Sequence, residues 1–228
     1  YNMPYRPTPL SFKVDEKTFF NERPISTQQT SFCFIGQMRN FVPDFYAGIV
    51  WWTNDDPNMA PFTPVYCTVT EIPACYTKIE DEQDDVTFSW NSAFWVQNTV
   101  SNMVYPYYSK IFPDLKKERD DIEKRNFRKV KNLESMIRNK SDKEDTQESI
   151  ARLTKFSTGS ANTMLKAWTN LFQYIVVKHN DMATKKVDHL GKFTKTKDGL
   201  CESPERPGYP ESYRKEIIKE TGDKYLIK

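Results

Sequence analysis

The chain has 228 residues, a formal net charge of +2 and a mean hydropathy of -0.73. Its 32 aromatic residues are too many for a disordered chain, and no apolar run reaches the roughly 18 residues of a membrane span. The near-neutral charge excludes a uniformly basic nucleic-acid binder. We therefore expect a folded protein of one large or two small domains, without a membrane span or a nucleic-acid partner.

Charged and aromatic residues divide the chain into two halves. Residues 1–113 hold 7 basic, 12 acidic and 23 aromatic side chains. Residues 114–228 hold 26 basic and 19 acidic side chains. The first half therefore predicts a dense core or site region, and the second predicts solvated, charged helices.

The predicted elements begin with strands. Four prolines in residues 1–24 predict an extended arm, because proline disfavours regular helix. Runs of apolar and β-branched residues predict strands at 29–39, 47–53 and 62–72, joined by short turns as an antiparallel meander. The first two runs are almost continuously apolar, which predicts strands covered on both faces.

Helical periodicity follows an acidic loop at residues 80–85. Thr87 or Ser89 is predicted to cap the first helix, Pro106 to end it, and Gly159 to separate two later helices. The predicted helical segments are 90–104, 113–140, 150–156, 161–176 and 211–219, with a loop at 191–210.

Strands followed by helices predict an α+β fold. Residues 1–86 form the arm and the antiparallel strands, and residues 87–228 form the helical region. A three-stranded sheet is thin, and one layer of helices covers only one of its faces. We therefore infer that strands outside this chain complete the sheet.

Cysteine and histidine residues predict no metal site. No pair has C-x-x-C or zinc-finger spacing. Cys33, Cys67 and Cys75 are interpreted as buried thiols, and a disulfide between two of them stays open. His179 and His189 are interpreted as surface residues.

Few other residues carry a chemical signal. The turn at 54–58 offers oxygen ligands but has the composition of an ordinary turn. The basic segment 116–140 is interleaved with acidic residues, which is typical of a solvated helix face. Arg39 follows an apolar strand, where a guanidinium pairs with a carboxylate of the protein or of a substrate. Both readings of Arg39 stay open.

Three stretches together carry a resemblance. They are residues 30–39 (TSFCFIGQMR), residues 48–57 (GIVWWTNDDP) leading to 61–66 (PFTPVY), and residues 88–98 (FSWNSAFWVQN). In this order and spacing they resemble the C-terminal half of the cysteine dipeptidases related to secernin. Residues 207–210 (PGYP) are also similar.

The resemblance implies an N-terminal-nucleophile hydrolase with a four-layer αββα sandwich. In such enzymes a cysteine at the mature N-terminus attacks the peptide carbonyl, and its own α-amine is the base. The implied substrates are small peptides, chiefly dipeptides, and no cofactor or metal is implied.

Residue 1 is tyrosine, so the resemblance implies that the nucleophile is not on this chain. The chain is then the C-terminal portion of a larger hydrolase domain, inert alone, with the N-terminal portion of the same protein as its partner. By resemblance, Arg39 binds a substrate carboxylate or orients the nucleophile, Asp56 meets a substrate ammonium group, and Asn91 points into the site or starts a helix.

Two other classes remain open: a non-catalytic interaction or scaffold domain of the same fold, and an unrelated binding module with an aromatic face. A homo-oligomer is also possible from the sequence. The cellular compartment is not assigned by any feature of these residues.

Overall fold

The computed structural model describes residues 11–20, 25–140 and 145–227. The chain divides into two compact units, Tyr1–Gln173 and Tyr174–Lys228, and each is described by itself. Within the described ranges, no helix combines the length and apolar character that a membrane crossing requires.

A short hairpin comes first in the described part of the chain. Strands β1 (Ser11–Val14) and β2 (Lys17–Phe20) pair antiparallel. Asp15 and Glu16 join them with φ values of 48° and 63°, the left-handed backbone that a two-residue hairpin turn requires. The predicted arm therefore contains a hairpin, and its residues 1–10 and 21–24 lie outside the described ranges.

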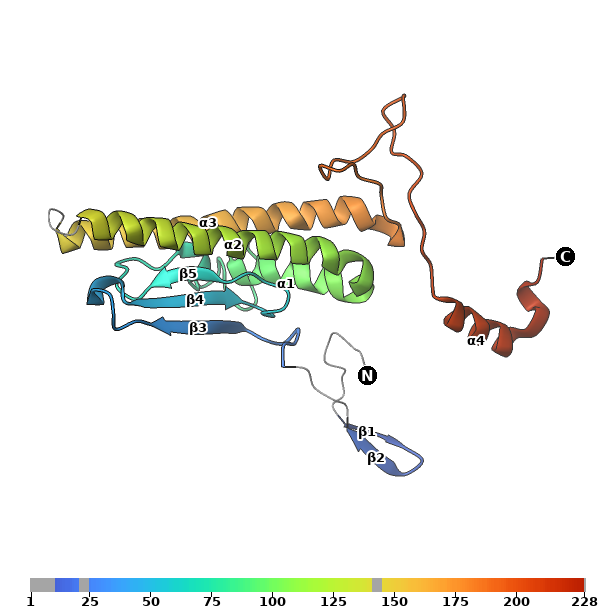
Figure 1. Ribbon diagram of the computed structural model, residues 1–228. Helices are drawn as coiled ribbons and strands as arrows, with labels where there is room; N and C mark the ends of the chain where they lie inside the picture. Colours follow the sequence, from blue (N-terminus) through green and yellow to red (C-terminus); the bar gives the residue numbers. More distant parts are fainter. Residues whose placement is uncertain (1–10, 21–24, 141–144, 228) are drawn as a thin grey trace. The chain divides into compact units, whose positions relative to one another are not determined.

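The main sheet has three antiparallel strands in the order β3–β4–β5 (Figure 1). They are β3 (Phe32–Met38), β4 (Gly48–Asn54) and β5 (Thr63–Tyr66). The predicted antiparallel meander is confirmed, although β5 is shorter than predicted. Alternate residues of β4 are fully buried on the side that faces the helices, whereas their neighbours are half-buried.

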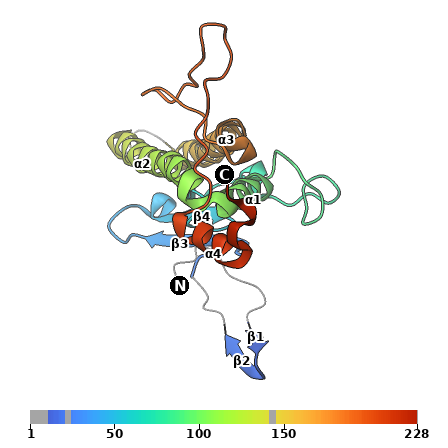
Figure 2. The ribbon, with the colours of Figure 1, turned by 90° about the vertical axis from the view of Figure 1, so that its right-hand side faces the viewer.

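Three helices of the first unit lie on one side of the sheet (Figure 2). They are α1 (Ala93–Val104), α2 (Tyr108–Lys140) and the part of α3 (Thr146–His179) that belongs to this unit. Strands followed by helices confirm an α+β fold. The core joins buried side chains of β4, β5, α2 and α3: Ile49, Trp51, Tyr66, Val130, Leu133, Ile137 and Leu153.

The helix boundaries differ from prediction at three places. The N-cap of α1 is Ser92, not Thr87 or Ser89, because the Ser92 side chain accepts from the Trp95 backbone N–H. Helix α2 starts before Pro113, since the 3-10 turn at residues 105–107 leads directly into it. Helix α3 continues through Gly159, because a helical glycine costs only about 1 kcal/mol relative to alanine.

The second unit contains the last turns of α3, an extended segment and α4 (Glu211–Thr221). Isolated bridges such as Thr184 with Glu205 hold the extended segment, which confirms the predicted loop at 191–210. His179 is 8% exposed, so its interpretation as a surface residue is wrong. The chain folds back after α3 and places the Thr184 hydroxyl 3.5 Å from Nδ1 of His179.

The four cysteines are free thiols. Only Cys75 is buried, whereas Cys33 is half-buried and Cys67 is exposed, so the prediction of three buried thiols is correct for Cys75 alone. Cys33 lies on the outermost strand of the sheet and Cys67 directly follows β5, where no helix covers them completely.

Candidate functional site

The edge of β3 is open in the first unit. Six of its seven residues are exposed, including Phe34 at 58% and Ile35 at 54%. Among the described strands, only β4 pairs with it. The prediction of a strand covered on both faces is therefore wrong for this chain taken alone, because β3 lies at the rim of the sheet and farthest from the helices (Figure 1).

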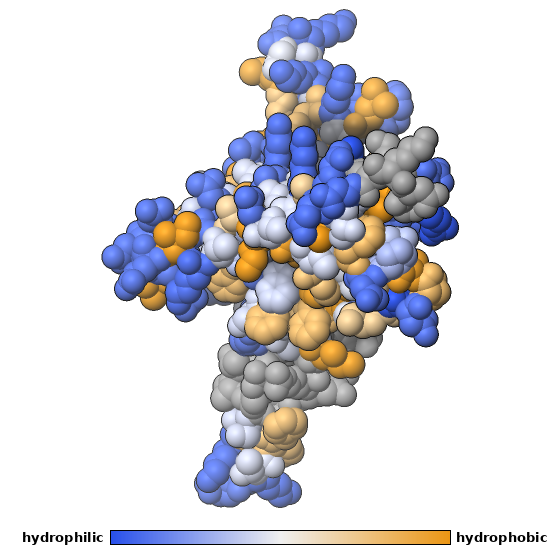
Figure 3. Space-filling model, turned by 90° about the vertical axis from the view of Figure 1, so that its left-hand side faces the viewer, coloured by the Kyte–Doolittle hydropathy of each residue, from blue (hydrophilic) through white to orange (hydrophobic). Residues whose placement is uncertain are grey.

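A groove of about 750 Å³ lies between this edge and helix α2. Its walls are largely apolar, with Ile35 and Trp51 from the sheet and Phe127 from α2. The Trp51 and Phe127 rings lie 4.5 Å apart between centroids. Figure 3 shows large apolar side chains exposed among hydrophilic ones on one face of the molecule.

Next to the groove, the segment 54–62, which runs from the last residue of β4 to the start of β5, is held from two sides; we call it the clamped turn. Helix α1 provides the first side. Gln97 accepts from the Asn54 backbone N–H at 3.2 Å. Asp55 accepts from Asn98 at 2.9 Å and from Ser101 at 2.6 Å. Its φ of 61° places this aspartate in the left-handed region, which a residue with a side chain rarely adopts.

Asp56 is buried at the centre of the clamped turn, with only 1% of its surface exposed. Its carboxylate accepts from the hydroxyls of Ser26 and Tyr105 and from the Asn58 backbone N–H. Burial raises the pKa of Asp56 to about 6. Burial also raises the pKa of Asp55, against the opposing effect of its hydrogen bonds.

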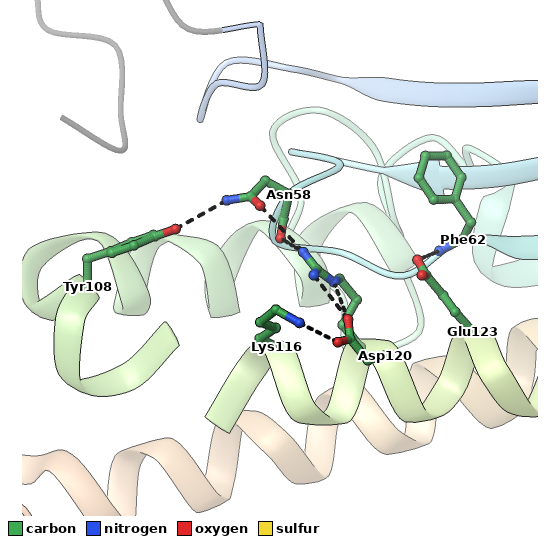
Figure 4. Close-up of polar contacts among 7 residues, drawn as sticks. Asn58, Phe62, Tyr108, Lys116, Asp120 and Glu123 are labelled. Atoms are coloured by element: carbon green, nitrogen blue, oxygen red, sulfur yellow. Dashed lines mark hydrogen bonds and ion pairs between the residues drawn. The ribbon is translucent and has the colours of Figure 1, made fainter. Parts of the chain in front are cut away.

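Helix α2 holds the other end of the clamped turn (Figure 4). Arg119 donates to the carbonyl oxygen of Asn58, and the Asn58 side chain donates to the Tyr108 hydroxyl at 3.4 Å. Glu123 accepts from the Phe62 backbone N–H at 3.1 Å. Burial raises the pKa of Glu123. These side-chain hydrogen bonds from α1 and α2 hold the backbone of the clamped turn in one position.

Arg39 forms an ion pair at the end of β3. Its Nη1 lies 2.8 Å from Oε2 of Glu134, and each side chain is 9% exposed. Arg39 also donates to the carbonyl oxygens of Tyr46 and Ala47. The Tyr66 hydroxyl donates to the other oxygen of Glu134 at 2.8 Å. Of the two interpretations of Arg39, the structure therefore shows the ion pair with a carboxylate of the protein, which is Glu134.

The three residues singled out from the sequence occupy different places. Arg39 lies at the end of β3 and Asp56 in the clamped turn. Asn91 is exposed and comes just before the N-cap of α1, where its backbone N–H donates to Ser89. Among their described contacts, no hydrogen bond or ion pair joins any two of the three.

The polar side of α1 escaped sequence reasoning. Gln97 and Ser101 of α1 and Tyr105, the C-cap residue of this helix, follow one another at intervals of four, so they lie on one side. All three contact the clamped turn: Gln97 through Asn54, Ser101 through Asp55 and Tyr105 through Asp56. The available signal was that these polar residues directly follow the apolar residues Val96, Val100 and Val104, which are buried on the same side of the helix.

The described residues contain no group of three histidine, cysteine or acidic side chains placed to hold a metal ion. Cys75, the buried thiol, has its pKa raised by burial to about 12. It is therefore protonated at neutral pH and a poor nucleophile. Asp55 and Asp56 are the groups suited to binding a cation or a proton, since burial favours an added positive charge or protonation.

Sequence comparison assigns this chain to a family of peptidases. The model of Peptidase family C69 matches residues 2–121, which is more than half of the chain. The chain belongs to this family, and the resemblance to dipeptidases is confirmed.

One curated relative is the probable dipeptidase B of Lactococcus lactis subsp. lactis (strain IL1403), which is 29% identical over 178 residues. The match covers 77% of this chain and 34% of the relative. The chain therefore spans about a third of the length of the relative that it matches.

Proposed function

We propose that this chain is the C-terminal portion of a cysteine dipeptidase that hydrolyses small peptides. The observation that carries the proposal is the family match over residues 2–121, together with a dipeptidase relative about three times longer than the matched region. The complete domain would be a four-layer αββα sandwich, in which this chain supplies one sheet and one helix layer.

In this proposal the nucleophile is a cysteine at the mature N-terminus, on the part of the polypeptide outside this chain. Its thiolate attacks the peptide carbonyl, and its own α-amine takes the thiol proton and then protonates the leaving amine. Water then hydrolyses the thioester. The cysteines of this chain are internal residues, so none of them carries a free α-amine.

Asp56 is the residue that we assign to the substrate's ammonium group. Its buried carboxylate is held by neutral donors, Ser26, Tyr105 and the Asn58 N–H, and the positive charge of Arg119 offsets its negative charge only in small part. A buried carboxylate gains from a cation brought close to it. The clamped turn would keep that carboxylate in a fixed position while the substrate binds.

For Arg39 we propose a positioning role. Its guanidinium already contacts Glu134 and the carbonyl groups of Tyr46 and Ala47, so few donors remain for a substrate carboxylate. Arg39 would instead orient the nucleophile by fixing the end of β3. Asn91 is exposed, and a site role for it would depend on residues outside this chain.

The test is a dipeptide-hydrolysis assay on two proteins: the 228-residue chain and the polypeptide extended upstream of Tyr1 to its start. We expect the longer protein to hydrolyse Ala-Ala and to lose activity with iodoacetamide, and the shorter one to be inactive. Hydrolysis by the 228-residue chain would refute the proposal. An inactive long protein without a cysteine at its mature N-terminus would identify a scaffold domain of the same fold instead.

Asp56→Asn in the longer protein tests the substrate contact. We expect a higher KM for dipeptides and little change in KM for the same peptides with an acetylated N-terminus. An equal effect on both kinds of peptide would refute an ammonium contact at Asp56.

A further inference from the structure

We propose that the open edge of β3 and the adjacent groove form one docking surface for an extended segment of the polypeptide outside this chain, with apolar side chains where the segment enters the groove. The inference rests on the proposed function, because it takes the occupant from the remainder of the same protein. The relative leaves about two thirds of its length outside the match, which is ample chain for such a segment.

The composition of β3 argues for a permanent neighbour. Exposed edge strands are normally protected by charged residues, prolines or bulges that discourage pairing. The seven residues of β3, FCFIGQM, include no charge and no proline, and they pair with β4 in unbroken register. A partner strand of the same seven residues would span about 23 Å.

The groove indicates where the side chains of a strand paired with β3 would lie. Ile35 lies opposite Trp51 in the register, so both are on the helix side of the sheet. A strand paired with β3 places every second side chain on that side. Those side chains would fill the groove against Trp51, Phe62 and Phe127. The alternate side chains would join Phe32 on the other side of the sheet.

The charged residues of the groove are already satisfied. Arg119 donates to the carbonyl oxygen of Asn58, and Glu123 accepts from the Phe62 backbone N–H. A charged side chain entering the groove would therefore lose hydration without gaining a free partner. This contrast favours an occupant whose inserted residues are apolar.

Beyond Phe127 the surface of α2 changes character. Lys124, Arg125 and Arg128 line a second hollow together with Phe127 and with Asp121, whose carboxylate pairs with Lys117, so the hollow has an excess of positive charge. Earlier in the same helix, Lys116 pairs with Asp120 one turn away. Charge complementarity therefore predicts that the docked segment carries carboxylates where it leaves the groove over α2.

Hydrogen exchange of β3 in the two proteins tests the docking. In the longer polypeptide we expect the β3 amides to exchange at least about tenfold more slowly than in the 228-residue chain. Ile35→Lys and Phe127→Lys should remove this protection from the longer protein. In the shorter protein Ile35→Lys should leave the melting temperature unchanged, because Ile35 is 54% exposed, whereas Phe127→Lys should lower it, because the Phe127 ring packs on Trp51. Met136→Lys is the matched control, because Met136 is 57% exposed on the same helix and does not line the groove.

Equal exchange of β3 in both proteins would overturn the proposal, as would protection that survives Ile35→Lys. A 228-residue chain that sediments as a dimer, and becomes a monomer with Ile35→Lys, would overturn it in favour of a second copy. Protected β3 in a longer protein that does not hydrolyse dipeptides would support docking and count against the proposed function. A longer protein that hydrolyses dipeptides while its β3 amides stay unprotected would support the proposed function and overturn the docking.

Discussion

Removing Glu134 should destabilise the first unit by about 3–5 kcal/mol, the usual consequence of breaking a buried ion pair. Glu134 and Arg39 are each 9% exposed, and their side chains meet at 2.8 Å. In Glu134→Ala the Arg39 guanidinium keeps its charge but loses its counter-ion. The Tyr66 hydroxyl loses its acceptor at the same time.

Three further variants separate these contributions. Tyr66→Phe removes one hydrogen bond to a charged group and should cost about 1.5–3 kcal/mol. The double variant Arg39→Met with Glu134→Leu should cost less than the sum of Arg39→Ala and Glu134→Ala, because no charge is left uncompensated. Arg152→Ala is the control, since its pair with Glu148 is exposed and should contribute less than about 1 kcal/mol.

Urea unfolding followed by circular dichroism at 222 nm measures these free energies. A cost below about 1 kcal/mol for Glu134→Ala would refute the reasoning, as would strict additivity of the Arg39 and Glu134 substitutions. The result also bears on catalysis. If Arg39 is a positioning residue, Arg39→Ala in the longer protein should lower kcat more than it raises KM for dipeptides, at a temperature where the variant stays folded.

Three other outcomes are expected. Burial raises the pKa of Asp56 from 3.8 to about 6, so the folded state binds a proton at this carboxyl more tightly than the unfolded state does. The contribution of Asp56 to the free energy of unfolding therefore falls as pH rises from about 4 to about 6. Relative to the wild type, Asp56→Asn should therefore gain up to about 3 kcal/mol over that range, and parallel pH profiles in urea titrations would contradict this. Ser92→Ala removes the N-cap of α1 and should cost about 1 kcal/mol, with Ser92→Asp restoring stability; a loss that aspartate fails to recover would argue against capping. In native protein a thiol reagent should label Cys67 rapidly and Cys75 only on unfolding, because Cys75 is buried and its pKa is raised; rapid labelling of both, read by peptide mass, would show that Cys75 is accessible.

Local patterns in the sequence predicted the elements well. Almost continuous runs of apolar and β-branched residues located β3 and β4, and apolar periodicity located the helices. Boundaries were less predictable. Ser89 and Ser92 are equally good capping residues by composition, and only the position of Trp95 relative to Ser92 selects between them.

Burial of the candidate site was not predictable in the same way. The composition of residues 54–58 is that of a solvated turn, and the segment does form a turn. Its carboxylates are nonetheless buried, because α1 and the segment around Ser26 cover them with hydroxyl and amide groups. Those donors come from distant parts of the chain.

The sequence by itself determined the family, the order of strands and helices, and the absence of charged residues and prolines from β3. It determined these because each depends on neighbours along the chain. Only the tertiary structure decided that Arg39 pairs with Glu134, 95 residues away, and that Asp56 lies buried against Tyr105. Such partners are brought together by packing of the helices on the sheet, and no local pattern of residues records which distant side chains will meet.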